Sequence, residues 1–144
     1  MKKLLITLFS IAAISVNAQY MDLKGLTFQA TSYYNTDDGP SKSATCNQIY
    51  DISFSDCMMA HNILKDDGSI DAVQFYKIVD LKRSLDDGIT LFKFSCISGV
   101  SGSIYKYRVK IDAKGIATME EITDSLDITF IGGTYQIRTY DQNQ

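Results

Sequence analysis

The sequence predicts an all-β domain, an antiparallel meander of about eight strands, in which closure into an up-and-down barrel is favoured over a two-layer sandwich. Apolar and polar residues alternate with a period of two along most of the chain, as they do in half-buried strands. Turn signals separate these runs, and most of the links are short. A single flat sheet would leave its edges and one apolar face bare, so we expect the sheet to close or to pair with a second.

The clearest alternating runs place the expected strands in chain order. They span Leu26–Ala30, Tyr50–Phe54, Phe92–Cys96 and Tyr105–Ile111. In the last run apolar residues alternate with Lys106, Arg108 and Lys110, which is typical of a strand with one solvated face. Turn signals separate the runs, at Asp66–Gly68, Asp86–Gly88, Ser98–Gly102, Asp112–Gly115 and Gly132–Gly133.

One hairpin can be tested for register within the sequence. A loop over Gly99–Gly102 sets Phe92 opposite Val109 and Phe94 opposite Tyr107. Apolar side chains then meet apolar side chains on one face of the hairpin, as cross-strand pairing requires. We therefore expect these two strands to be neighbours in the sheet.

A second hairpin is expected at the C-terminal end of the chain. With Gly132–Gly133 as a two-residue turn, Phe130 faces Tyr135 on one side. Asp127 then meets Arg138 on the other side, as an opposite-charge cross-strand pair. The sequence thus predicts a turn at the two glycines.

The N-terminus has the pattern of an export signal. Two lysines precede an apolar run from Leu4 to Val16, which ends in Val16-Asn17-Ala18 with small residues at the positions that a signal peptidase reads. The run is shorter than the ~20 apolar residues that a transmembrane helix needs. We expect residues 1–18 to be a cleaved Gram-negative-type signal peptide and residues 19–144 to form a single β domain, periplasmic or secreted.

The net charge of the chain limits the classes of partner that it favours. The formal net charge is −3, and it becomes −5 when the two signal-peptide lysines are removed. A mildly acidic chain without a basic run does not favour nucleic acid, and no second apolar stretch is long enough to span a membrane. Lys106, Arg108 and Lys110 form a basic stripe with Lys93 across the hairpin, which predicts a solvated outer face, with a weak site for anionic polymers as the alternative.

The chain has three cysteines, and an exported protein is expected to oxidise two of them. Counting successive antiparallel strands places Cys46 and Cys96 at one end of the sheet and Cys57 at the other. We expect a Cys46–Cys96 disulfide and a free thiol at Cys57, although the other pairings stay open.

The stretch "DCMMAHNIL" contains residue types that bind soft metals. If Ser55-Asp56 is a turn, the following strand places Cys57, Met59 and His61 on one face and Met58 on the other. Cys, Met and His together suit copper, so periplasmic copper binding is a third hypothesis for function. No second histidine exists to complete the site, and a core strand is the favoured interpretation. No metal or other cofactor is therefore expected.

No pattern in the sequence indicates catalysis. His61, the one histidine, has no evident serine or cysteine partner. Glu120 and Glu121 are neighbours on a strand, so they face opposite sides and cannot act on one substrate. We expect a binding protein and not an enzyme.

The predicted barrel is similar in outline to the calycins, which include lipocalins and fatty-acid-binding proteins. The resemblance is one of architecture, because the Gly-x-Trp motif of lipocalins is missing from a chain without Trp. It implies a lumen that holds a small apolar or amphipathic molecule, and this is the first hypothesis for function. The aromatic residues expected to line that lumen are Phe28, Phe92, Phe94, Tyr105 and Tyr107.

The run Ser101-Gly102-Ser103-Ile104-Tyr105 resembles the Ser-Gly-x-x-Tyr loop of periplasmic lysozyme inhibitors, which are small exported β-barrels. In that family the Ser and Gly enter the lysozyme cleft, so the resemblance implies partner-binding roles for Ser101, Gly102 and Tyr105. The family's downstream Trp-x-Lys element is missing here. A module that binds or inhibits another exported protein is thus the alternative to the lumen hypothesis.

Overall fold

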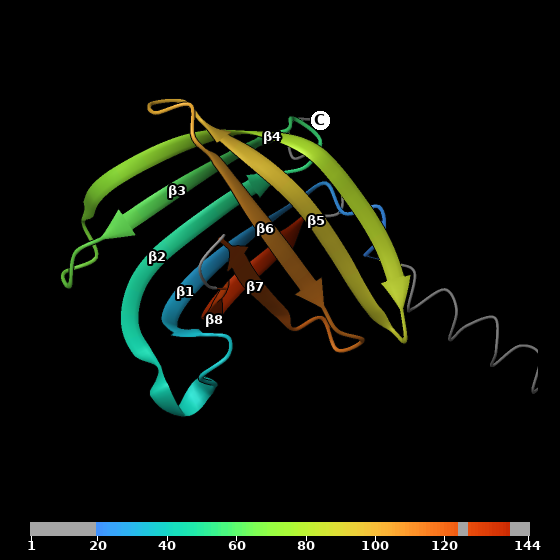
Figure 1. The fold of residues 1–144 in the computed structure, drawn as a ribbon, viewed down its shortest axis with the longest axis horizontal. Helices are drawn as coiled ribbons and strands as arrows, with labels where there is room; N and C mark the ends of the chain where they lie inside the picture. Colours follow the sequence, from blue (N-terminus) through green and yellow to red (C-terminus); the bar gives the residue numbers. More distant parts are fainter. Residues whose placement is uncertain (1–19, 124–126, 139–144) are drawn as a thin grey trace, which may run out of the picture.

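The protein is a closed, eight-stranded antiparallel barrel in which each strand pairs with the next and β8 pairs with β1 (Figure 1). The computed structural model describes residues 20–123 and 127–138, with residues 131–138 described by their backbone alone. The strands are β1 Gly25–Asn35, β2 Ala44–Ser53, β3 Met58–Leu64, β4 Ile70–Asp86, β5 Ile89–Ser98, β6 Ile104–Ile111, β7 Ala117–Ile122 and β8 Asp127–Arg138. A short 3₁₀ turn, η1 (Pro40–Lys42), lies between β1 and β2.

This architecture confirms the predicted all-β meander and the barrel in preference to the sandwich. The expected signal peptide, residues 1–18, lies outside the described residues. Within the described ranges, no helix has the length and apolar character needed to cross a membrane.

The period-2 alternation of the sequence decides which side chains face the interior. In β6 the side chains of Tyr107, Val109 and Ile111 are buried, whereas that of Lys106 is exposed. The predicted register of this hairpin is confirmed, because Phe92 pairs with Val109 and Phe94 pairs with Tyr107. The buried residues of all eight strands form one hydrophobic cluster inside the barrel.

The predicted turn at Gly132–Gly133 is wrong. Strand β8 runs continuously through both glycines, and Phe130 pairs with Met119 of β7 in place of Tyr135. Gly132 pairs with Ala30 of β1, next to a shift in the β1–β8 register. A glycine inside a strand is typical of such a bulge, because it has no side chain to place.

Strand β4 contains a second irregularity. Val79 pairs with Ser95 and Lys82 pairs with Lys93, so Asp80 and Leu81 together stand opposite a single residue of β5. Asp80 has a left-handed backbone, with φ of 55°. Such a β-bulge bends the strand that carries the extra residue.

The two ends of the barrel differ in chemistry. We call them the Leu23 end and the Gln48 end. At the Leu23 end, Leu23 is fully buried, and the Arg83 guanidinium lies 5.8 Å from the ring centroid of Phe54 and 5.7 Å from that of Phe92. The same guanidinium donates a hydrogen bond to the carbonyl oxygen of Met21 at 3.2 Å. This end is therefore closed by apolar packing and one cation.

Candidate functional site

The aromatic side chains expected to line a ligand lumen pack against other side chains. Phe28, Phe92, Phe94 and Tyr107 are buried in the core cluster, and Tyr105 is half-buried at its margin. The ring of Phe92 stacks on Phe54 with centroids 4.6 Å apart, and that of Phe94 stacks on Tyr107 at 5.7 Å. These five residues do face the interior, where their contacts are with the protein itself.

Polar side chains gather inside the barrel at the Gln48 end. The Gln48 Oε1 atom accepts a hydrogen bond from the Tyr50 hydroxyl at 2.9 Å and lies 2.8 Å from Nε2 of His61. Because an amide oxygen only accepts, Nε2 is the protonated nitrogen of that imidazole. Within β4, the Tyr76 hydroxyl donates a hydrogen bond to Oε1 of Gln74.

Burial shifts the ionisation of this cluster. Desolvation lowers the pKa of His61 to about 4, so the imidazole is neutral at pH 7. Desolvation also raises the pKa of Glu121, and it raises the pKa of the Tyr50 and Tyr107 phenols far above their ordinary value, with a smaller contribution from the Glu121 charge. The cluster is therefore a neutral, hydrogen-bonded network next to one desolvated carboxyl group.

Sequence reasoning did not single out Gln48 or Gln74, and it weighed Glu121 only as a catalytic carboxylate beside Glu120. Their positions in the strand alternation could have revealed Gln48 and Glu121. Gln48 is two residues from the buried Tyr50, and Glu121 is two residues from the buried Met119, so each faces the interior. A polar residue at an inward-facing position of a strand indicates an interior hydrogen-bond network. The pattern of one strand does not show which residues of the other strands it meets.

The three candidate copper ligands do not share the environment that was expected of them. The β2–β3 turn takes Phe54–Cys57, so Cys57 precedes the strand, with φ of 55° and an exposed side chain. Met59 is buried and His61 lies in the network just described, while Met58 faces outward as predicted. Within the described residues, no group of three or more His, Cys, Asp or Glu side chains is placed to hold a metal ion.

The expected Cys46–Cys96 disulfide is not formed, and all three cysteines are free thiols. Strands β3 and β4 separate the strands of Cys46 and Cys96 around the barrel wall. The Cys46 thiol contacts the carbonyl oxygen of Ala30 at 3.5 Å, while Cys96 is fully buried. Burial raises the pKa of both thiols, that of Cys96 to about 12.

The β5–β6 loop, Gly99–Ser103, projects from the Gln48 end of the barrel (Figure 1). Oγ of Ser98 accepts hydrogen bonds from the backbone N–H groups of Val100 and Ser101, and its carbonyl oxygen accepts one from Gly102. The Gly99 N–H donates to the carbonyl oxygen of Phe75 at 2.9 Å, which ties the loop to β4. The loop is thus braced by hydrogen bonds to Ser98 and to β4.

The three residues of the Ser-Gly-x-x-Tyr pattern do not lie on one surface. Ser101 and Gly102 are exposed in the loop. Tyr105 is turned into the barrel, where its ring meets Tyr76 edge to face with centroids 5.6 Å apart. Only the first two residues are therefore available to a partner at the surface.

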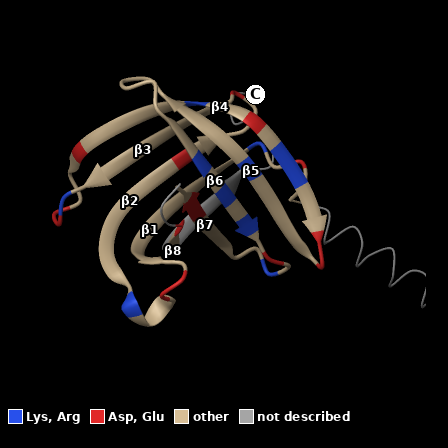
Figure 2. Ribbon diagram, in the orientation of Figure 1, with Lys and Arg blue, Asp and Glu red and all other residues tan. Residues whose placement is uncertain are grey.

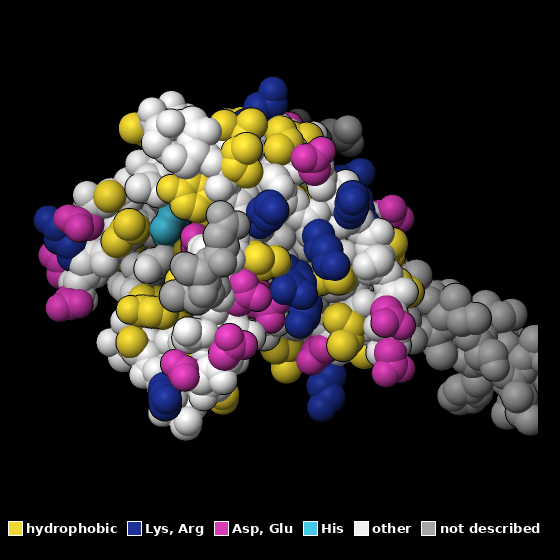
Figure 3. Space-filling model, viewed as in Figure 1, with side chains coloured by type: hydrophobic (Ala, Val, Ile, Leu, Met, Phe, Trp, Pro, Cys, Tyr) yellow, Lys and Arg dark blue, Asp and Glu magenta, His cyan; other side chains and the backbone are white. Residues whose placement is uncertain are grey.

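Large apolar side chains are exposed around this loop. Val100 is 88% exposed, Ile104 66% and Phe75 58%, and we call these three residues the Val100 patch. Figure 3 shows hydrophobic side chains gathered along β4 beside the loop. Exposed apolar residues that gather in one place mark interaction surfaces more often than scattered ones do.

The predicted basic stripe lies on the outer face of β5 and β6 (Figure 2). Nε of Arg108 lies 2.8 Å from a Glu120 carboxylate oxygen, and Nζ of Lys110 lies 3.5 Å from the other oxygen. Glu120 therefore faces outward while Glu121 faces the interior, as their adjacent positions predict. One carboxylate partly neutralises the end of the stripe that lies nearest to the Leu23 end.

Comparison with models of known protein families, with curated proteins and with solved structures finds no match in any of the three. A barrel fold hosts many unrelated functions, so the geometry of particular sites has to carry any functional conclusion.

Proposed function

We propose that this protein is an exported, non-catalytic binding module that docks onto another protein through the β5–β6 loop and the Val100 patch. The observation that carries this proposal is a valine, 88% exposed, on a loop held by backbone hydrogen bonds. A braced loop loses little conformational freedom on docking, so more of its contact energy remains as affinity.

The partner that this surface fits has an apolar cleft rimmed by carboxylates. Val100 and Ile104 supply the apolar contact, and Lys77 pairs with Ile97, the neighbour of Ile104 across the ladder. Lys106 follows on the same outer face of β6. Cations at the edge of an apolar patch favour a negatively charged rim on the partner.

The resemblance of the Ser101–Tyr105 run to lysozyme inhibitors makes lysozymes the first partners to test. The chain from residue 19 onward is mixed with lysozymes of several structural types, and both lysis of peptidoglycan and binding are measured. We expect inhibition by the natural chain and a loss of affinity of tenfold or more for Val100→Asp, since a central contact is worth about 2 kcal/mol.

Ile116→Asp is the matched control. Ile116 is 52% exposed, but it lies in the β6–β7 turn at the Leu23 end. Equal affinities of the Val100→Asp and Ile116→Asp variants would exclude docking through the Val100 patch. Failure to inhibit any lysozyme would exclude this class of partner.

A small amphipathic ligand inside the barrel is the second proposal. The observation that favours it is the polar Gln48 end, where the half-buried His61 and Tyr105 offer hydrogen-bond groups beside aromatic rings. Native mass spectrometry of the exported protein tests it, because a ligand of lipid size adds its mass to the chain. A clean apo mass after gentle desalting counts against it.

A further inference from the structure

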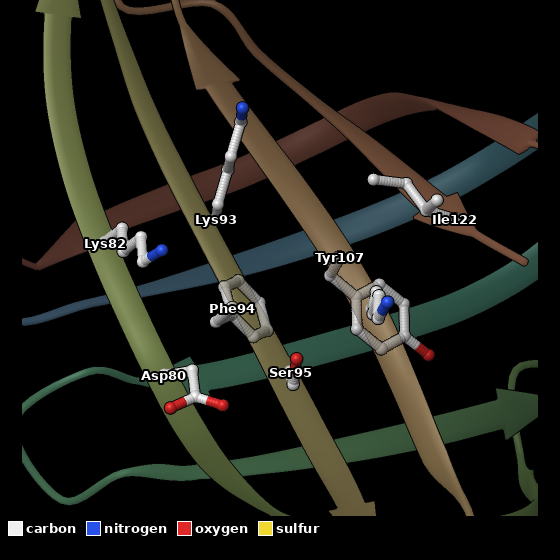
Figure 4. Close-up of a pocket in the computed structure, with 8 residues that line it drawn as sticks. Asp80, Lys82, Lys93, Phe94, Ser95, Tyr107 and Ile122 are labelled. Carbon is white, nitrogen blue, oxygen red and sulfur yellow. The ribbon is translucent and has the colours of Figure 1, made fainter.

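A groove of about 360 Å³ lies on the outer face of the barrel, across β4, β5, β6 and β7 (Figure 4). This volume falls within the roughly 300–1,000 Å³ that small-molecule sites occupy. The groove is lined by Asp80 and Lys82 from β4, Lys93 and Ser95 from β5, Lys106 from β6 and Ile122 from β7. Phe94 and Tyr107, whose side chains are buried in the core, complete its lining, and none of the three residues of the Val100 patch belongs to it.

The groove adjoins the β-bulge of β4. Asp80 and Leu81 occupy the space opposite one residue of β5, and the side chain of Leu81 packs against the core. Asp80 is thereby left on the outer face with a left-handed backbone, a conformation that Asp tolerates better than most residues. The local bend sets Lys82 beside Lys93, its partner in the ladder.

Three ammonium groups line the groove without a counter-charge in contact with them. Among the described residues, Lys82, Lys93 and Lys106 form no ion pair, whereas the neighbouring Arg108 and Lys110 share Glu120. Asp80 is the one carboxylate in the lining, so the groove has a formal charge of +2 in a chain of net charge −3. Like charges that stand directly opposite each other in a ladder, as those of Lys82 and Lys93 do, are destabilising, and a bound anion relieves that repulsion.

The donor set suits a phosphate group. Lysines are common phosphate ligands and act as point charges, so they can approach a tetrahedral oxyanion from different sides. The groove contains no arginine. Ser95 stands directly opposite Lys106 in the β5–β6 ladder, so its hydroxyl adds a neutral donor beside that ammonium group.

We infer that this groove is an anion site for a phosphate monoester, held by Lys82, Lys93, Lys106 and the Ser95 hydroxyl. Ile122 supplies an apolar wall for the organic part of the ester. The source of that phosphate is either a free ester or a lipid headgroup. The inference does not depend on the proposed protein partner, because binding of a phosphate ester is measured without that partner; Lys106 is the one residue that both proposals use.

Titration with inorganic phosphate and with glycerol 1-phosphate, followed by backbone amide NMR shifts at constant ionic strength, tests the site. We expect saturable shifts at residues 80–82, 93–95 and 106, and at least tenfold weaker binding by the K82Q/K93Q/K106Q variant. The K24Q/K42Q/K114Q variant removes the same charge from exposed lysines elsewhere and should bind as the natural chain does. Circular dichroism verifies the fold of both variants.

Vesicles of phosphatidylcholine with and without phosphatidic acid identify the source of the phosphate. Binding to vesicles that contain phosphatidic acid, lost in K82Q/K93Q/K106Q alone, assigns a lipid headgroup, and binding of the soluble esters alone assigns a free ester. Equal losses in the two triple variants would overturn the site, as would shifts spread over all exposed lysines. The absence of both ester and vesicle binding would overturn it as well.

Discussion

The imidazole of His61 lies flat against the ring of Tyr50, with centroids 4.2 Å apart and an interplanar angle of 8°. The same two side chains share Oε1 of Gln48 as their hydrogen-bond acceptor. The only histidine of the chain is thus held on both its flat face and its edge by residues of β2. Burial of the ring favours the neutral imidazole, because desolvation disfavours the charged form.

The first prediction concerns pH. The pKa of His61 is about 4 in the folded protein and about 6.5 when the chain is unfolded. Above pH 6.5 both states are neutral, and as the pH falls from 6.5 to 4 the unfolded state alone binds the proton, so His61 lowers the stability across that window. His61→Gln removes the titration, and we expect its free energy of unfolding to fall less than that of the natural chain between pH 7 and pH 4.

Urea unfolding at several pH values gives the measurement for both proteins. Glu121 contributes with the opposite sign, because its raised pKa favours the folded state as the pH falls. It is present in both proteins, so the difference between them isolates His61. Parallel pH profiles of the two would contradict a depressed histidine pKa.

The second prediction tests how well the barrel interior is filled. Phe92 is fully buried and stacks on the Phe54 ring, and the Arg83 guanidinium lies 5.7 Å from its ring centroid. Phe92→Ala should lower the free energy of unfolding by about 3–5 kcal/mol, as expected for a close-packed core phenylalanine. Phe75→Ala removes the same side chain from the outer surface and should change it by less than about 0.5 kcal/mol. Equal, small effects in denaturant titrations would instead indicate an interior with room for a ligand.

The third prediction concerns the thiols. In the folded protein a thiol reagent such as Ellman's should modify Cys57 rapidly, because it is exposed, and should leave Cys96 unmodified, because it is buried with a raised pKa. Unfolding without a reductant should then expose the remaining thiols to the reagent. If no further thiol reacted after unfolding, Cys46 and Cys96 would be joined in a disulfide in the isolated protein.

The fourth prediction addresses the bracing of the β5–β6 loop. Ser98→Ala removes the Oγ acceptor of two backbone N–H groups, those of Val100 and Ser101. We expect faster amide hydrogen exchange in the loop, with a loss of about 1 kcal/mol or less in global stability, because the bonds are exposed. Ser103→Ala is the control, and it should leave the exchange of those two amides unchanged. Unaltered exchange in the Ser98→Ala variant would show that the loop is held by other contacts.

Local pattern alone placed much of the barrel correctly. The alternation of Tyr107, Val109 and Ile111 with basic residues identified the inner face of β6, and the β5–β6 register followed from the loop length. In β3, Met59 and His61 lie on the face predicted for them, and they pair with Ile52 and Tyr50 of β2. Only Cys57 was misplaced there, because the turn takes four residues and not two.

The features that the local sequence pattern did not predict depend on closure of the barrel. Gly132–Gly133 has the composition of a hairpin turn, yet β8 continues through it to pair with β1, a strand from the other end of the chain. The pairing of β1 with β8 satisfies backbone groups along both edges, which a local turn would leave open.

By itself the sequence determined the strand period, most turns and which residues face inward, because these depend on neighbours along the chain. The tertiary structure alone decided that His61, Gln48 and Tyr50 meet in one network, that Glu121 lies inside beside Tyr107, and that the β4 bulge sets Lys82 beside Lys93. Most of these contacts join different strands, and their positions around a closed wall follow from register and bulges. No single strand contains that information.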